Sequence, residues 1–325
     1  MFSVSRNAVL GLAALALAAS PAAAQTKWNF PSAYPATNFH TENLAQFAKD
    51  VEKESGGKLS LTLHPGASLF KAPEIKRAVQ TGQAEIGEVL SSLLENEDPI
   101  FGVDVVPFLA SSYPESRKLY AAAKPFMQKK LESQGIILLY AVPWQPQGIY
   151  AKKDINSVND MKGLKWRAYN RGTTRIAELA GAQAVTVQQA ELAQALATGV
   201  VESFMTSSAT GVDTKAWETM THFYDVQAWL PYNIVIVSKA AFDKLDKATQ
   251  DAVRKAAATA ETRGWKASED KNAGFINTMK QNKMKVQAPS AELKAGLAKI
   301  GNTLAEEWSK RAGADGEAVL KAFKK

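Results

Sequence analysis

The stretch "GLKWRAYNRGTTRIAELAGAQAVTVQQAELAQALATGVVESFMT", residues 163–206, decides the fold class. Three short segments in it have the pattern of strands, and the two segments between them have the pattern of helices. Strands that alternate with helices are typical of a mostly parallel sheet covered by helices. The expected strands are "GLKWRAY", "QAVTV" and "VVESFMT", and the expected helices are "TTRIAELAGA" and "QAELAQALATG".

The same alternation occurs earlier in the chain. The windows "AVQTGQAEI" (78–86) and "ALATGVVES" (195–203) align without gaps, with Ala, Thr, Gly and Glu at matching positions. Because there are only two copies, we expect two similar α/β domains and not a solenoid. In the first copy, strands are expected at 26–30, 58–64, 84–90 and 135–142, and helices at 39–55, 73–82 and 115–134.

A very long helical pattern follows at about residues 248–282. It contains no proline and only two glycines, Gly264 and Gly274. One unbroken helix of this length would span roughly 50 Å, enough to bridge both domains. The alternative is two helices broken at one of the glycines.

The first 24 residues have the pattern of a secretory signal peptide. Arg6 supplies a positive charge, residues 8–19 are apolar and uncharged, and "PAAAQ" offers small residues for cleavage after Ala24. The apolar run is shorter than the roughly 20 residues that span a bilayer. We therefore expect an exported, soluble mature protein.

Composition and motifs argue for binding and against catalysis. The chain has no cysteine, which excludes disulfides, thiol catalysis and cysteine-bound metals. Its 39 basic and 32 acidic residues are interspersed, so a solvated surface is expected and nucleic-acid binding is not. Nucleotide-binding and hydrolase motifs are absent, and His40, His64 and His222 lack metal-ligand spacing. We expect no enzyme activity, no cofactor and no metal.

Arg167 is the residue that most suggests a ligand. It lies near the carboxyl end of an expected strand, where open α/β sheets bind ligands. Its guanidinium offers a planar fork of donors that matches a carboxylate. The alternative is an exposed arginine on an edge strand.

Residues 160–203 resemble the central motif of the solute-binding proteins of tripartite ATP-independent periplasmic (TRAP) transporters, DctP type. That family has a Lys-Gly-Leu-Lys-x-Arg stretch, a Gly-Ala before a short strand and a helix ending in Gly-x-Val-(Asp/Glu), all present here in order. The signal peptide, "AVQTGQAEIG" and the long helix fit as well. The resemblance extends over essentially the whole mature chain.

The resemblance implies a two-lobed periplasmic binding protein fold, in which crossing strands and a long helix join the lobes. The implied lobe I is 25–147 plus about 234–272, and the implied lobe II is 148–233 plus about 273–325. The ligand would bind in the cleft, the lobes would close over it, and the protein would deliver it in the periplasm to TRAP membrane permease subunits driven by an ion gradient.

The resemblance also assigns site residues. The family's carboxylate-binding arginine falls on Arg167. Tyr150 lies where many members have a second arginine, and Thr206, followed by Ser207, lies where many have a ligand-binding asparagine. A Glu-Trp pair that binds metal in some members is missing, so no metal is expected.

Aromatic residues suggest the ligand type. Trp144, Tyr169, Trp217 and Trp229 lie, with Tyr150, in segments expected to border the cleft, and the segment around Trp217 resembles the family branch associated with aromatic or related monocarboxylates. We expect an aromatic monocarboxylate, although core packing of these rings is an open alternative. Tyr34, His40 and Gln147 are candidates for polar contacts, and His40 could instead lie on the surface.

Three other functions are less favoured. One is the same role for a small aliphatic oxo- or hydroxy-acid, the second is an exported enzyme with an unrecognised site, and the third is the binding module of an ATP-driven importer.

Overall fold

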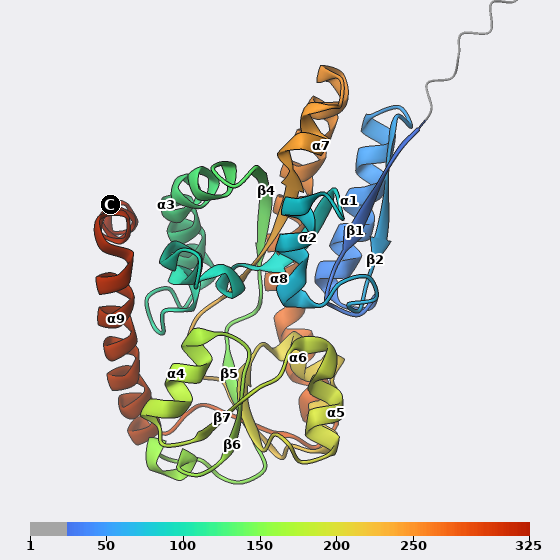
Figure 1. Cartoon of the computed structure of the whole chain (residues 1–325). Coiled ribbons are helices and arrows are strands. Elements are labelled where there is room, and N and C mark those ends of the chain that lie inside the picture. The colour runs from blue at the N-terminus through green and yellow to red at the C-terminus, as the bar shows by residue number, and fades with distance from the viewer. Residues whose placement is uncertain (1–24) are drawn as a thin grey trace, which may run out of the picture.

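The computed structural model describes residues 25–325, so the predicted signal peptide lies outside the described residues. They form two α/β lobes, and long helices run along both (Figure 1). Lobe I, the upper lobe in Figure 1, contains β1 (Thr26–Pro31), α1 (Phe39–Glu54), β2 (Leu59–His64), α2 (Ile75–Thr81), β3 (Ile86–Leu90), α3 (Tyr113–Glu132), β4 (Ile136–Pro143), β10 (Tyr232–Ser238) and α7 (Lys239–Asp243). Lobe II contains β5 (Gly148–Ala151), β6 (Lys165–Ala168), α4 (Arg171–Leu179), β7 (Gln183–Thr186), α5 (Leu192–Ala197), β8 (Ser203–Thr206), α6 (Ser208–Asp213), β9 (His222–Tyr224) and β11 (Lys285–Gln287).

The sheets are less parallel than the sequence pattern predicts. In lobe I, β1 pairs in parallel with β2, but β10 lies between β3 and β4 and is antiparallel to both. In lobe II the order is β11-β9-β5-β8-β6-β7, and β5 is antiparallel to both of its neighbours. The prediction of mostly parallel sheets was wrong for β5 and β10, because these strands follow crossings between the lobes and so enter each sheet from the opposite direction.

Two crossing segments, residues 144–147 and 228–231, connect the lobes side by side. The Trp144 backbone N–H donates to the Pro231 carbonyl at 2.8 Å, and the Gln147 N–H donates to the Trp229 carbonyl at 2.9 Å. These bonds satisfy backbone groups that would otherwise be buried without partners. The segments therefore form a two-stranded link beside the cleft.

The long helix is confirmed. It is α8 (Lys247–Gln281), a single helix of 35 residues that packs on α1 and β4 in lobe I and on α6 in lobe II. The alternative of a break at Gly264 or Gly274 is wrong. At Gly264 an added Cβ would lie 2.4 Å from a Val142 methyl, so glycine permits the close packing of α8 there.

A second long helical segment, α9 (Ala291–Lys324), also runs along both lobes (Figure 1), and it is kinked at Gly313, where the backbone is not helical. Leu293 and Leu297 near its start are buried in the core of lobe II. Trp308 and Val319 are buried with α3 side chains in a core of lobe I. The family resemblance implies that about 273–325 belong to lobe II, but the C-terminal half of α9 packs on α3 of lobe I.

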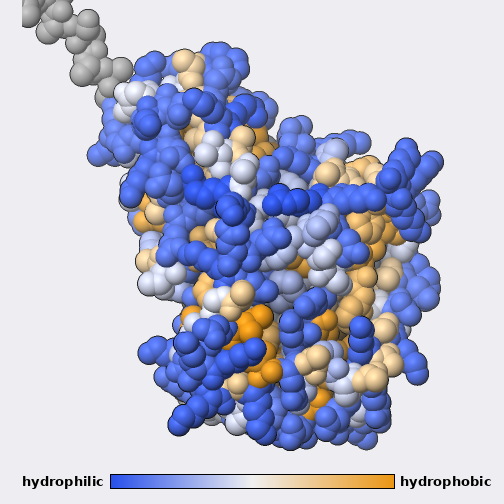
Figure 2. Space-filling model, turned by 180° about the vertical axis from the view of Figure 1, so that it is seen from behind, coloured by the Kyte–Doolittle hydropathy of each residue, from blue (hydrophilic) through white to orange (hydrophobic). Residues whose placement is uncertain are grey.

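The face of the molecule in Figure 2 is mostly hydrophilic, with hydrophobic residues gathered in a few places. Among residues 25–325, Leu69 and Val200 are the exposed large hydrophobic side chains. No helix in this part of the chain combines the length and apolar character needed to cross a membrane.

Candidate functional site

A cavity lies between the two lobes, next to the crossing segments. Its volume is about 430 Å³, including the space that opens to solvent. Its lining combines apolar residues of lobe I with polar residues at strand ends of lobe II. It is lined by Tyr34, Ala72, Leu90, Leu93, Trp144, Gln147, Arg167, Tyr169, Gln188, Gln189, Thr206, Ser207, Thr210 and Pro231.

Arg167 carries the charge of this cavity. It lies on β6, which is flanked by β7 and β8, and is 3% exposed, so the alternative of an exposed edge-strand arginine is wrong. Its Nε donates to the Val187 carbonyl at 2.9 Å, and its guanidinium carbon lies 4.6 Å from the centre of the Tyr169 ring. Burial lowers the pKa of Arg167 to about 10, so it remains charged at neutral pH.

The terminal nitrogens of Arg167 are available to a ligand. Among residues 25–325, no ion pair and no hydrogen bond involves its Nη1 or Nη2 atoms, although charged groups are rarely buried without a partner. A carboxylate in the cavity would complete this site by accepting two parallel hydrogen bonds. In the same part of the chain, no three carboxylate or imidazole groups are placed to hold a metal ion.

Seven of the ten predicted site residues lie together in the cavity lining. They come from both lobes and from one crossing segment, which explains why they are scattered in sequence. They are Tyr34, Trp144, Gln147, Arg167, Tyr169, Thr206 and Ser207.

The structure places the other three predicted residues behind the cavity wall. The Tyr150 hydroxyl donates to the Ser207 carbonyl at 3.0 Å, and the ring stacks on Phe204. Trp229 is buried in the core of lobe II. His40 is 1% exposed, which rules out a surface position. These three support lining residues but do not line the cavity.

Sequence reasoning missed several lining residues. Gln188 and Gln189 follow the end of β7 by two and three residues, so the strand-end rule that selected Arg167 could have found them. Leu90 lies at the end of β3 by the same rule. Pro231 gave no local signal because its position depends on how the second crossing segment pairs with the first.

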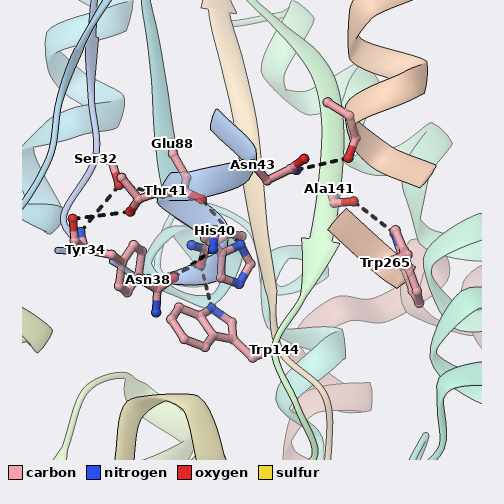
Figure 3. Close-up of polar contacts among 12 residues, drawn as sticks. Ser32, Tyr34, Asn38, His40, Thr41, Asn43, Glu88, Ala141, Trp144 and Trp265 are labelled. Atoms are coloured by element: carbon pink, nitrogen blue, oxygen red, sulfur yellow. Dashed lines mark hydrogen bonds and ion pairs between the residues drawn. The ribbon is translucent and has the colours of Figure 1, made fainter. Parts of the chain in front are cut away.

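A buried polar cluster lies behind Tyr34 and Trp144 in lobe I (Figure 3). Glu88 accepts a hydrogen bond from the Ser32 hydroxyl at 2.7 Å, and its other oxygen lies 3.5 Å from Nδ1 of His40. Burial raises the pKa of Glu88 to about 7 and lowers the pKa of His40 well below its usual value. The His40 ring lies 4.3 Å from the Trp144 ring, so this cluster supports the cavity wall.

Replacing Glu88 with glutamine is expected to increase stability at pH 8 and to leave it nearly unchanged at pH 4. The pKa of Glu88 rises from 4.5 to about 7 on folding. The contribution of Glu88 to the stability of the wild type is therefore complete below pH 4.5, where the carboxyl is protonated in both states. This contribution is lost as the pH rises through 7. At 1.36 kcal/mol per pKa unit, the gain at pH 8 is roughly 3 kcal/mol. Thermal unfolding of both proteins at both pH values measures it, and an equal effect at the two pH values would contradict the prediction.

Comparison with known proteins agrees with this geometry. The sequence profile of "Bacterial extracellular solute-binding protein, family 7" (DctP) matches residues 30–311. The chain belongs to this family. The DctP-type resemblance and the two-lobed fold expected from the sequence are thus confirmed.

Two solved structures and one sequence relative illustrate the similarity. Bordetella pertussis DctP6, an extracytoplasmic solute receptor binding pyroglutamic acid, is 59% identical, with a TM-score of 0.91 over 92% of this chain and 99% of that one. A marine metagenome TRAP solute-binding protein specific for pyroglutamate is 44% identical, with the same TM-score and coverage, and contains co-purified pyroglutamate. A solute-binding protein of Albidiferax ferrireducens is 28% identical over 221 residues, which span 66% of this chain and 64% of that protein.

Proposed function

We propose that this protein is a periplasmic TRAP receptor that captures a small cyclic monocarboxylate, pyroglutamate or a close analogue, and delivers it to membrane permease subunits. The observation that carries the proposal is the buried Arg167, whose terminal nitrogens face no acidic side chain of the described chain. The family and the two pyroglutamate-binding neighbours support the ligand class.

The cavity suits such a ligand. Arg167 would hold the carboxylate, while Leu90, Leu93 and Pro231 would cover the ring. The hydroxyl of Thr206, at the end of β8, would hydrogen-bond a polar ring substituent. The site thus offers one charged anchor, one apolar wall and a few polar groups.

The aromatic monocarboxylate expected from the sequence has less support. That expectation rested on five rings, and two of them, Tyr150 and Trp229, are core residues. Trp217 also packs against a core cluster and does not line the cavity. Trp144 and Tyr169 do line it, so a flat ring carboxylate stays in the test panel.

Calorimetric titration of residues 25–325, refolded to remove any co-purified ligand, tests the proposal. The panel contains pyroglutamate, proline, glutamate, benzoate, 4-hydroxybenzoate, pyruvate and succinate. A ligand that binds only the folded state adds about 2.7 kcal/mol to the free energy of unfolding at 100 times its Kd. It therefore also raises the melting temperature. We expect the tightest binding for pyroglutamate. Tighter binding of benzoate or of an open-chain acid would reject the ligand assignment.

A further inference from the structure

The orientation of the Asn233 side chain fixes which hydrogen bonds Tyr34 can make. One atom of the Asn233 amide faces both Nε1 of Trp144, at 2.9 Å, and the Tyr34 hydroxyl, at 3.2 Å. An indole N–H can only donate, so the Asn233 atom facing it is the oxygen. The Tyr34 hydroxyl faces the same oxygen and therefore donates to it as well.

Tyr34 consequently presents only an acceptor to the cavity. A phenol has one proton, and the Tyr34 proton is used in the bond to Asn233. Burial, together with the nearby Glu88, raises the pKa of Tyr34 and keeps it protonated. The indole N–H of Trp144 also donates to the Asn233 oxygen. Neither the Tyr34 hydroxyl nor the Trp144 N–H can therefore donate to a ligand.

The same reasoning fixes the hydrogen-bond role of the Tyr169 hydroxyl. The Gln145 carbonyl can only accept, so the Gln147 atom 2.9 Å from it is Nε2. The Gln147 oxygen then faces the Tyr169 hydroxyl at 3.2 Å, and that hydroxyl donates to it. Neither tyrosine of the cavity therefore has a proton to offer a ligand.

We propose that Tyr34 is a specificity-determining residue that selects carboxylates carrying an N–H donor on the ring. This inference rests on the proposed function, because Arg167 must hold the carboxylate. Tyr34 belongs to lobe I and Arg167 to lobe II, so a ligand that contacts both spans the cleft. The lactam N–H of pyroglutamate would donate to the Tyr34 oxygen, whereas a ring oxygen at that position would place lone pairs against lone pairs.

A matched ligand pair isolates this contact. Pyroglutamate and 5-oxotetrahydrofuran-2-carboxylate have nearly the same shape, but a ring oxygen replaces the N–H in the second compound. We expect the wild type to bind the lactone roughly 100-fold more weakly, since a buried acceptor loses its partner and faces another acceptor. Titration of both compounds gives the ratio of their Kd values.

Variants then assign the preference to Tyr34. In Tyr34→Phe the ratio should fall below about 5-fold, because the acceptor is gone. In Asn233→Leu it should also fall, because the freed Tyr34 proton can then be donated to the lactone ring oxygen. Tyr140→Phe is the matched control, because Tyr140 is a buried tyrosine of lobe I outside the cavity lining. Removal of its hydroxyl should leave the ratio of Kd values as in the wild type. Because the ratio compares the Kd values of two ligands in the same variant, a loss of affinity that affects both ligands equally does not change it.

The outcomes separate this inference from the proposed function. Equal binding of lactam and lactone by the wild type, or an unchanged ratio in Tyr34→Phe and Asn233→Leu, overturns the inference while pyroglutamate binding stands. Binding of neither compound overturns both.

Discussion

Arg167→Ala is expected to weaken carboxylate binding by roughly 100- to 5,000-fold. The ligand carboxylate would be buried in the cavity without its charged partner, a change that costs about 3–5 kcal/mol in other buried ion pairs. Arg167→Lys should lie between this variant and the wild type, because an ammonium keeps the charge but loses the planar fork and the Nε bond to the Val187 carbonyl. Calorimetric titration with pyroglutamate measures both variants.

A stability measurement distinguishes this loss from unfolding. Without ligand, the Arg167 guanidinium is buried without an acidic partner among the described residues, and burial lowers its pKa. Its removal should therefore leave the melting temperature of the ligand-free protein unchanged or raise it. Arg171→Ala is the control: Arg171 lies four residues away and does not line the cavity, so binding should be retained. Normal affinity in Arg167→Ala would reject the site assignment.

The position of Arg167 in the cavity lining agrees with a local rule that the sequence shows, since it lies at the carboxyl end of a strand in an α/β sheet. Tyr150 was placed wrongly for a related reason. The two-residue alternation of a strand separates its faces but does not say which face borders the cleft. Tyr150 points to the face that packs on Phe204, and the cavity lies elsewhere.

Asn233 shows the limit of sequence reasoning more clearly. It sets the donor and acceptor roles of Tyr34, from which it is separated by 199 residues in sequence. The two meet because β10 crosses back from lobe II and enters the lobe I sheet between β3 and β4. A local pattern predicts each strand but not a pairing between strands so far apart. The antiparallel position of β10 could not be predicted for the same reason.

Gly264→Ala and Gly274→Ala should change stability in opposite directions, although both lie in α8. Alanine favours a helix over glycine by up to about 1 kcal/mol, which is the whole expected effect at Gly274, where no atom lies within 4 Å of an added Cβ. At Gly264 the new methyl would lie 2.4 Å from a Val142 methyl and 2.7 Å from Nδ2 of Asn43.

These neighbours of Gly264 cannot move away easily. The Asn43 amide donates to the Ala260 carbonyl at 3.0 Å and accepts from Nε of Arg263 at 2.7 Å, while Val142 is fixed in β4. Overpacking of this kind costs about 1–3 kcal/mol, which outweighs the gain in helix propensity. Urea unfolding of the two variants should therefore place Gly264→Ala below the wild type and Gly274→Ala above it. If Gly264→Ala is as stable as Gly274→Ala, then α8 does not need the close approach to β4 and α1 that we assign to Gly264.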